Sequence, residues 1–554
     1  MHYGFEVLRS LVLGVGLALA ACSQGPYSSD DLGTRGAGTQ ATDGAPSPDD
    51  RCTPATTVDP LSVSTTRGVV RGMEAGTTVA FLGIPYAAPP VGSLRFAQPV
   101  EHACWSDVKA ATRFGSQCMQ VDPATQQPVG DENCLFLNVW TPTLDATAAL
   151  PVLFWVHGGA DIVGAGDQRL SAAGSNLYDG QKLADREHAV VVTMNYRLGA
   201  LGFLANALLD AEDAHGASGD YAIGDQLLAL RWVQKNITHF GGDTKRVMLF
   251  GESAGAMNTC VLLTSPLSKG LFSRALMESG DCSAKPRTEA ESIGAAIATK
   301  LGCSDVACLR QTPASQIALQ TPVSLPIDGS TNLKEGLSGT LQFAASVNGY
   351  TVTDDPMKLL TSSHYEKVPL LIGTNAQEMA LFLVSITTFT CSRYETDMMM
   401  LFGAGAPSVI GAYPCNLDGR AAEVAALTDL AMSCPAQRIA LASSANGAAT
   451  YRYHFTHTAD YGPTVGLGAY HAAELPYVFD TFAAEGYFPT PGEQGLSDLM
   501  KDAWGHFATD ATPGGTWPTY SEGDRKWMQL DSTSAVADDS LTAKCAVWAQ
   551  VMGW

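Results

Sequence analysis

Short apolar segments alternate with helix-like segments along most of this chain, and this alternation constrains the fold more than any other feature. Six runs of apolar and β-branched residues are predicted to be strands: 150–159, 189–196, 246–251, 274–280, 368–373 and 449–455. Amphipathic stretches such as 225–237 lie between several of them. Strands that alternate with helices build parallel sheets, so we predict an α/β fold with a large, mainly parallel central sheet flanked by helices.

The region from residue 57 to 554 is predicted to be one large domain, because no long polar linker interrupts it. Hydrophobic residues make up 46% of the chain, which is enough for a sizeable core. Two stretches with weak strand signals, roughly 283–365 and 385–447, are predicted to be helical insertions over the carboxyl edge of the sheet.

Residues 249–258, with the sequence LFGESAGAMN, place Ser253 between Gly251 and Gly255. A strand-like run precedes this serine and a helix-like run follows it, as a nucleophile elbow requires. The serine of such an elbow has a strained backbone, and the two glycines let strand and helix approach closely. We interpret Ser253 as a nucleophile; the alternative is a serine in a glycine-rich structural turn.

A serine nucleophile needs a base, and the base needs an acid that orients it. In an α/β-hydrolase these partners follow the serine in the order acid, then histidine, each after a later strand. Glu378 follows the predicted strand 368–373 and is the candidate acid. Two histidines are candidate bases, His457 at the end of the next strand-like run and His471 in the loop beyond it. Position favours His471 but leaves His457 open.

The oxyanion that forms during acyl transfer needs preorganised N–H donors. Ala254 supplies one, since it directly follows the nucleophile. The others are expected after an earlier strand, where the sequence VHGGA at 156–160 forms a loop of small residues. Gly159 and Ala160 are the best donors in that loop.

Composition and spacing exclude several other kinds of function. The chain has 55 acidic and 33 basic residues, a net charge of −22, so it lacks the basic surface that binds nucleic acid. The same charge disfavours strongly anionic substrates. His454 and His457 stand three residues apart in a strand-like run, so they point to opposite faces, and no third ligand has metal-binding spacing. We expect no nucleic acid partner, no metal site and no cofactor.

The first 56 residues are predicted to direct export. Residues 1–21 contain Arg9 and an apolar run of about ten residues, which is typical of a signal peptide. The sequence LAAC at 19–22 resembles a bacterial lipobox, in which Cys22 is lipidated; an ordinary secretory signal with an incidental cysteine is the alternative. Residues 22–56 are polar and are predicted to form a flexible tether before the catalytic domain, 57–554. We expect a protein of the bacterial cell envelope or extracellular space, with membrane contact only through a lipid on Cys22.

Motifs distributed over residues 60–554 together resemble the type-B carboxylesterase family of α/β-hydrolases, which includes the cholinesterases. They are FLGIPYAAPPVGSLRF (81–96), GDENCLFLNVW (130–140), VHGGA (156–160), NYRLGALGFL (195–204), DQLLALRWVQKNITHFGGD (225–243), FGESAGA (250–256), LIGTNAQE (371–378) and YHAAELPYVF (470–479). The resemblance implies an α/β-hydrolase fold with its helical insertions over the active site. It also implies a catalytic triad of Ser253, Glu378 and His471, and an oxyanion hole formed by Gly159, Ala160 and Ala254. It therefore selects His471 over His457.

The activity that this resemblance implies is that of a serine carboxylic-ester hydrolase. Such an enzyme forms an acyl-enzyme from a small neutral ester and releases an alcohol and a carboxylic acid. A lipase or polymer esterase with a larger acyl pocket is the alternative. A non-catalytic surface-binding protein of the same fold is a further alternative, but it is distinguished by loss of a triad member, and none is missing here.

The resemblance also suggests how the cysteines pair in an exported chain. The implied disulfides are Cys118 with Cys134, Cys303 with Cys308 and Cys434 with Cys545. We further suggest Cys391 with Cys415 and Cys52 with Cys104, whose pairing the sequence leaves open. Cys260 is expected to be a buried free thiol, and Cys282 is left unassigned. Two implied ion pairs are Arg95 with Glu132, and Arg197 with Asp225.

Some residues depart from the pattern of the family. The loop 118–134 lacks the tryptophan with which cholinesterases bind quaternary ammonium, so we do not expect a specialist for choline esters. Asp161 stands where many relatives carry an aromatic or aliphatic residue, and it either alters the acyl pocket or faces solvent. Met379 and Ala472 replace glycines that often follow the acid and the histidine, but neither change removes a proton-transfer group.

Overall fold

The computed structural model describes residue 52 and residues 59–169, 176–321, 342–386, 388–416, 418–458 and 466–554. The predicted signal segment 1–21 and Cys22 lie outside the described residues, as does all of the predicted tether 22–56 except residue 52. In the part of the chain that is described, no helix has both the length and the apolar character needed to cross a bilayer.

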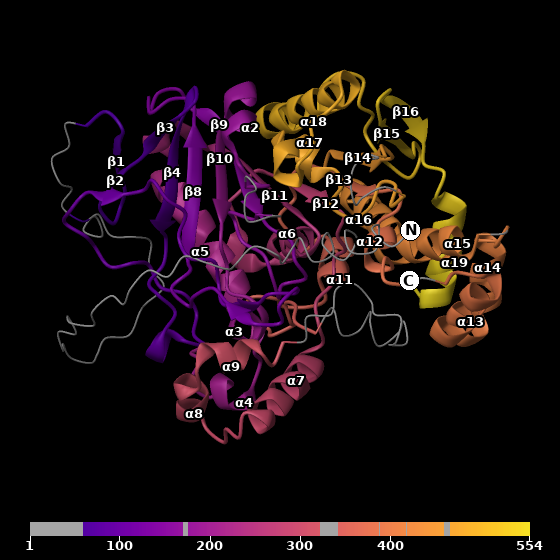
Figure 1. Cartoon of the computed structure of the whole chain (residues 1–554), viewed down its shortest axis with the longest axis horizontal. Helices are drawn as coiled ribbons and strands as arrows, with labels where there is room; N and C mark the ends of the chain where they lie inside the picture. The colour runs from indigo at the N-terminus through magenta and orange to yellow at the C-terminus, as the bar shows by residue number, and fades with distance from the viewer. Residues whose placement is uncertain are drawn as a thin grey trace.

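A twisted sheet of eleven strands forms the centre of the described structure (Figure 1). Its parallel part contains all six predicted strands and one more: β10 (Val190–Met194), β9 (Leu150–Val156), β11 (Gly242–Glu252), β12 (Arg274–Glu278), β13 (Leu370–Asn375), β14 (Thr450–Phe455) and β15 (Lys526–Leu530). Antiparallel strands extend both edges: β8 (Phe136–Thr141), β4 (Thr78–Pro85) and β3 (Met73–Ala75) beyond β10, and β16 (Ala535–Asp538) beyond β15. The predicted α/β fold with a large, mainly parallel sheet is confirmed.

Both faces of the sheet are buried, which explains why its central strands are apolar without interruption. Along β9, Val152 and Phe154 pack into the core on one face, while Leu153 and Trp155 pack into the core on the other. The first face is covered by α5 (Tyr221–Asn236), α6 (Ala254–Thr264) and α16 (Cys434–Ala445), and the second by α2 (Gln181–Glu187), α17 (Leu475–Phe479) and α18 (Pro491–Asp510).

The two predicted insertions are helical, and most of their helices lie at the carboxyl ends of the parallel strands (Figure 1). They contain α7 (Arg287–Lys300), α8 (Val306–Gln311), α9 (Ala314–Ala318) and α11 (Pro356–Thr361), then α13 (Cys391–Phe402), α14 (Ala406–Ala412) and α15 (Gly419–Thr428). In the first, α9 packs against α3 (Gly199–Phe203), which follows β10; in the second, α15 packs against α12 (Met379–Phe382), which follows β13. The last helix of the second stretch, α16, instead packs on β13 and β14.

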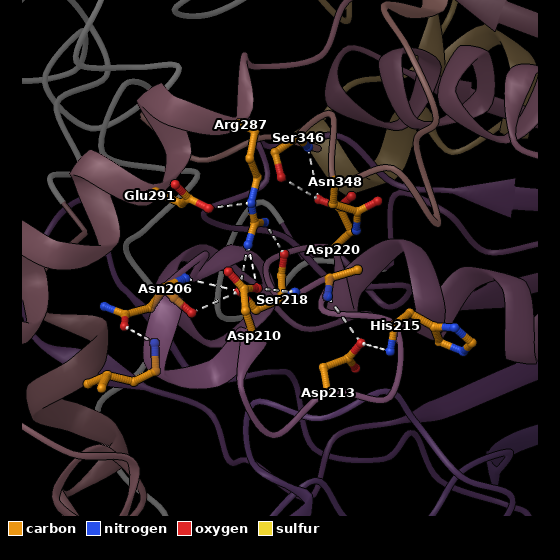
Figure 2. A network of polar contacts seen from close by, with 12 residues as sticks. Asn206, Asp210, Asp213, His215, Ser218, Asp220, Arg287, Glu291, Ser346 and Asn348 are labelled. Atoms are coloured by element: carbon orange, nitrogen blue, oxygen red, sulfur yellow. Dashed lines mark hydrogen bonds and ion pairs between the residues drawn. The ribbon is translucent and has the colours of Figure 1, made fainter.

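Polar contacts fasten the first insertion to the domain at two points (Figure 2). At its start, Arg287 pairs with Asp210 and donates to the hydroxyl of Ser218 at 3.1 Å. Further along, before α11, the backbone N–H of Ser346 donates to Oδ1 of Asp220 at 2.8 Å. Asp210 ends α4 (Ala207–Asp210), and Ser218 and Asp220 lie in the segment between α4 and α5, so both anchors join the insertion to the same region.

The remaining elements are short or peripheral. They include β1 (Ser62–Ser64), β2 (Val69–Arg71) and β5 (Lys109–Ala110) in a small second sheet, the pair β6 (Gln120–Val121) and β7 (Pro128–Val129), and the C-terminal helix α19 (Thr542–Met552).

Six disulfides link the described cysteines. Five are the pairs that the sequence suggested: Cys52 with Cys104, Cys118 with Cys134, Cys303 with Cys308, Cys391 with Cys415, and Cys434 with Cys545. The expectation of a free thiol at Cys260 is wrong, because Cys260 is bonded to Cys282 with 5.4 Å between their Cα atoms. The parallel pairing of β11 with β12 brings α6 next to the segment that follows β12. The even number of cysteines after Cys22 was the signal for this pair.

Both implied ion pairs are present. Nε of Arg95 lies 2.6 Å from Oε1 of Glu132. The guanidinium of Arg197 binds the carboxylate of Asp225 through two bonds, of 2.9 and 2.7 Å. Arg197 is 4% exposed and Asp225 is fully buried, so this bidentate pair fixes the segment after β10 to α5.

Candidate active site

Ser253 occupies the sharp turn between β11 and α6. Its backbone has φ 56° and ψ −124°, a conformation that side-chain-bearing residues rarely adopt. Its N–H donates to the carbonyl of Glu278 on the neighbouring strand at 2.9 Å. Ser253 is partly exposed at the carboxyl edge of the sheet, as a nucleophile must be.

Two glycines make this tight turn possible. A Cβ on Gly251 would lie 2.6 Å from the carbonyl oxygen of Val156, and a Cβ on Gly255 would lie 2.0 Å from the same oxygen. Real Cβ atoms do not approach so closely, so only glycine lets β11 and α6 pack against β9 in this way. The glycine pattern that predicted an elbow is thus explained by contact with a third strand.

Glu378 and His471 are joined directly. Nδ1 of His471 lies 2.7 Å from Oε2 of Glu378, whose other oxygen accepts the N–H of Asn375 at 2.7 Å. Asn375 is the last residue of β13. The end of this strand therefore fixes the carboxylate of Glu378, and that carboxylate orients the ring of His471. The bond at Nδ1 leaves Nε2 of the neutral imidazole as its proton acceptor.

The rival histidines lie elsewhere. The ring of His457 contacts Asp531 through Nδ1 at 3.0 Å and Glu493 through Nε2 at 3.4 Å. His454 stacks on Trp527 with 4.6 Å between the ring centres, and burial lowers its pKa to about 4. Of the two histidines that position left open, the structure places His471 against the candidate acid.

The imidazole of His471 also has an acidic neighbour at its other nitrogen. Oε1 of Glu252 lies 3.1 Å from Nε2, which is ion-pair distance, but the alignment does not make a hydrogen bond. Among the described residues no hydrogen bond links the hydroxyl of Ser253 to Nε2. Catalytic contacts of this kind often tighten only when substrate binds.

The predicted oxyanion loop adjoins the nucleophile. A Cβ built on Gly158 would lie 3.1 Å from the Cβ of Ser253, which measures how closely the two backbones approach. Gly159 and Ala160 both have left-handed backbones, with φ 108° and 55°. Within the described part of the chain their N–H groups have no hydrogen-bond acceptor, so these donors are available to a ligand. The N–H of Ala254, the first residue of α6, has no acceptor within the helix either.

Buried carboxyl groups surround the histidine. Burial lowers the pKa of His471, but Glu252 and Glu378 outweigh it and raise that pKa to about 9. Burial, together with the charge of Glu378, raises the pKa of Glu252 to about 7 against the opposing effect of His471. Burial also raises the pKa of Glu278 to about 8. The pKa of Glu474 lies well above its usual range because of burial and the same carboxylates.

The sequence did not predict that these buried glutamates lie around His471. Glu252 directly precedes Ser253 in the sequence, but nothing in that motif indicates its contact with His471. Glu278 and Glu474 come from other segments of the chain. The buried hydroxyl of Ser279, directly after β12, has no hydrogen-bond partner among the described residues. No group of three or more described His, Cys, Asp or Glu side chains is arranged to hold a metal ion.

Comparisons with known proteins agree with this geometry. The chain matches the carboxylesterase family over residues 59–401 and 418–548. It is 34% identical to the para-nitrobenzyl esterase of Bacillus subtilis (strain 168), covering 87% of this chain and 97% of that protein. It is 33% identical to the fumonisin B1 esterase of Sphingopyxis macrogoltabida, covering 84% and 86%. A solved structure of a PNB esterase superposes with a TM-score of 0.76 at 33% identity, covering 88% of this chain and all of the other.

Proposed function

The chain belongs to the carboxylesterase family and is a serine carboxylic ester hydrolase, and we propose that Ser253, His471 and Glu378 are its catalytic triad. The observation that carries this assignment is the 2.7 Å contact between Nδ1 of His471 and Glu378, beside a serine on a strained strand-to-helix turn. That contact fixes the tautomer in which Nε2 accepts a proton.

In the first half of the reaction, Oγ of Ser253 attacks the ester carbonyl and passes its proton to Nε2 of His471. The carbonyl oxygen becomes an oxyanion, which the N–H groups of Gly159, Ala160 and Ala254 bind. Collapse of this intermediate breaks the bond to the alcohol, which leaves with the proton from Nε2. The acyl group stays on Ser253.

In the second half, His471 removes a proton from water, and the hydroxide attacks the acyl-enzyme. The same donors bind the second oxyanion. When it collapses, Ser253 recovers its proton from His471 and the carboxylic acid leaves. Glu378 stays ionised throughout and stabilises the imidazolium each time it forms.

Substitution of the two proton-transfer residues tests this assignment. We expect Ser253→Ala and His471→Gln each to lower kcat on a p-nitrophenyl ester by at least about 10⁴-fold, since triad members act as a unit. His457→Gln is the matched control, because it removes a rival imidazole that also contacts two carboxylates, and it should retain activity. Full hydrolysis by Ser253→Ala, or loss of activity in His457→Gln alone, would refute the assignment.

The substrate class that we propose is a small neutral ester. The negative charges of Glu252 and Glu378 beside His471 support it, since they disfavour an anionic group in the site. Phe382 supports a small substrate, because its partly exposed apolar ring lies 5.1 Å from the ring of His471 and limits the space beside it. Rates measured on p-nitrophenyl esters of increasing acyl length should peak at short chains; a peak at long chains would favour the alternative, a lipase or polymer esterase.

We further propose that the protein is exported and held at the cell envelope through a lipid on Cys22. Support comes from the signal-like segment 1–21 and from six disulfides, which form in oxidising compartments. Membrane fractionation of cells that produce Cys22→Ser should find the protein released. If the variant stays bound to membranes, the lipid anchor is wrong.

A further inference from the structure

Asp161 comes directly after the two loop donors, and the structure buries its side chain. Only 2% of the residue is exposed, so the alternative in which Asp161 faces solvent is wrong. Its Oδ1 accepts a hydrogen bond of 2.8 Å from Nδ2 of Asn258, and the hydroxyl of Tyr196 is its other polar neighbour. No lysine or arginine among the described residues pairs with it.

Asn258 places the other end of this hydrogen bond on the nucleophile helix. It lies four residues after Ala254 in α6, one helical turn further along the same face, and it is 1% exposed. The hydrogen bond therefore connects the loop that carries Gly159 and Ala160 to the helix that carries the third donor.

The loop needs such a fastening because its backbone is strained. Gly159, Ala160 and Asp161 all have positive φ, of 108°, 55° and 59°. Left-handed backbone at alanine and aspartate persists only where surrounding contacts enforce it. Asp161 is held twice, through its side chain by Asn258 and through its carbonyl oxygen, which accepts the N–H of Gly199 at 2.7 Å.

We propose that Asp161 and Asn258 form a positioning pair that fixes the two halves of the oxyanion hole relative to each other. This inference rests on the proposed function, which assigns Gly159, Ala160 and Ala254 as the donors. Neither member of the pair touches the reacting atoms. A buried hydrogen bond suits this role better than apolar packing, because it fixes both distance and direction.

The pair does not depend on the charge of Asp161. Burial raises the pKa of this carboxyl group to about 7, against the lowering effects of the hydrogen bond from Asn258 and of the nearby Tyr196. Nδ2 of Asn258 donates to Oδ1 in either protonation state, since that oxygen keeps a lone pair in both. Asp161→Asn keeps an acceptor oxygen at this position, whereas Asp161→Ala removes it.

The decisive measurement is kcat per active site together with the Ki of a trifluoromethyl ketone, which binds as an oxyanion-bearing adduct of the serine. Sites are counted by end-point labelling with a fluorophosphonate. We expect Asp161→Ala and Asn258→Ala to lower kcat roughly 10- to 100-fold, as misplaced catalytic groups do, with KM little changed. Ki should rise by the same factor. A purely structural role would lower the number of sites but leave both constants unchanged.

The matched control is Thr259→Val, which removes a buried hydroxyl from the next position of α6. Among the described residues, that hydroxyl bonds only to the carbonyl oxygen of Gly255 in the same helix. It should change neither constant. The reversed pair, Asp161→Asn with Asn258→Asp, restores one donor and one acceptor across the same gap. It should recover most of the activity that Asn258→Asp alone loses through two facing carboxyl groups.

Normal kcat and Ki in both alanine variants would overturn the positioning pair while leaving the triad intact. If the alanine variants do not fold, the reversed pair decides, and its failure to improve on Asn258→Asp would also overturn the proposal. An active Ser253→Ala would instead overturn the proposed function. The two failures are therefore distinguishable.

Discussion

His471 lies between two carboxyl groups that act on it differently. Glu378 meets Nδ1 at 2.7 Å and orients the ring, whereas Glu252 lies 3.1 Å from Nε2, the nitrogen that takes the proton. Both negative charges favour the imidazolium, and together they raise the pKa of His471 to about 9 despite its burial. Because the base works in its neutral form, these charges raise the pH at which the enzyme becomes active.

Glu252→Gln should separate the two effects. It removes one negative charge and keeps the shape of the side chain, so the pKa of His471 falls. Activity is lost as pH drops below that pKa, and the acidic limb of kcat/KM should therefore move to lower pH by about one unit or more. Glu378→Gln is the contrast, since it should lower kcat strongly by disturbing the tautomer. A pH profile of Glu252→Gln that overlies that of the unchanged enzyme would contradict this account.

At this scale the sequence predicted the residues whose chemistry is local to a motif. Ser253 was predicted because glycines stand two residues before and after it. Glu378 was predicted because it follows a strand. Glu252 is also in the motif, but its contact with His471 joins residues far apart in the chain and depends on how two loops fold together. Asp161 and Asn258 are likewise distant in sequence, so their hydrogen bond could not be inferred from either residue alone.

The junction of β11 and α6 is the element on which the site depends most. Gly255→Ala would place a methyl group 2.0 Å from the carbonyl oxygen of Val156, so α6 would have to shift away from β9. We expect a loss of stability of about 3 kcal/mol or more, as for a severely overpacked site, and a loss of activity because Ala254 moves with the helix.

Gly411→Ala is the control for this substitution. Gly411 is an exposed residue of α14, and a Cβ there would have no atom within 4 Å. Alanine should leave activity unchanged and stabilise the protein by up to about 1 kcal/mol. Chemical denaturation and ester hydrolysis measure both effects, and equal stability in the two variants would show that the contact with Val156 does not constrain the junction.

The elements themselves were unequally predictable. The parallel strands were predicted because burial on both faces makes their sequences continuously apolar, as in β9. The antiparallel edge strands β3, β4 and β8 were not predicted, since their pairing depends on partners that no local pattern identifies. The disulfide between Cys260 and Cys282 was missed for the same reason, because it depends on the adjacency of β11 and β12.

Across the whole molecule, buried acids dominate the dependence of stability on pH. Burial raises the pKa of seven described carboxyl groups to between about 6 and about 8: Asp161, Asp167, Glu187, Asp220, Glu252, Glu278 and Glu423. Between about pH 4 and pH 8 the folded chain therefore binds more protons at these groups than the unfolded chain. Burial lowers the pKa of His157 and His454 to about 4, which acts in the opposite direction but at fewer groups.

A state that binds more protons loses stability relative to its alternative as pH rises, so the free energy of unfolding should fall from pH 5 to pH 8. Thermal unfolding should accordingly give a lower Tm at pH 8 than at pH 5. Asp220→Asn should weaken this dependence, because its amide oxygen can still accept the N–H of Ser346 while the titrating proton is gone. The exposed Asp107→Asn is the control and should leave the dependence unchanged. A Tm that rises over this range would mean that the buried carboxyl groups are ionised in the folded protein, with partners that the described contacts do not provide.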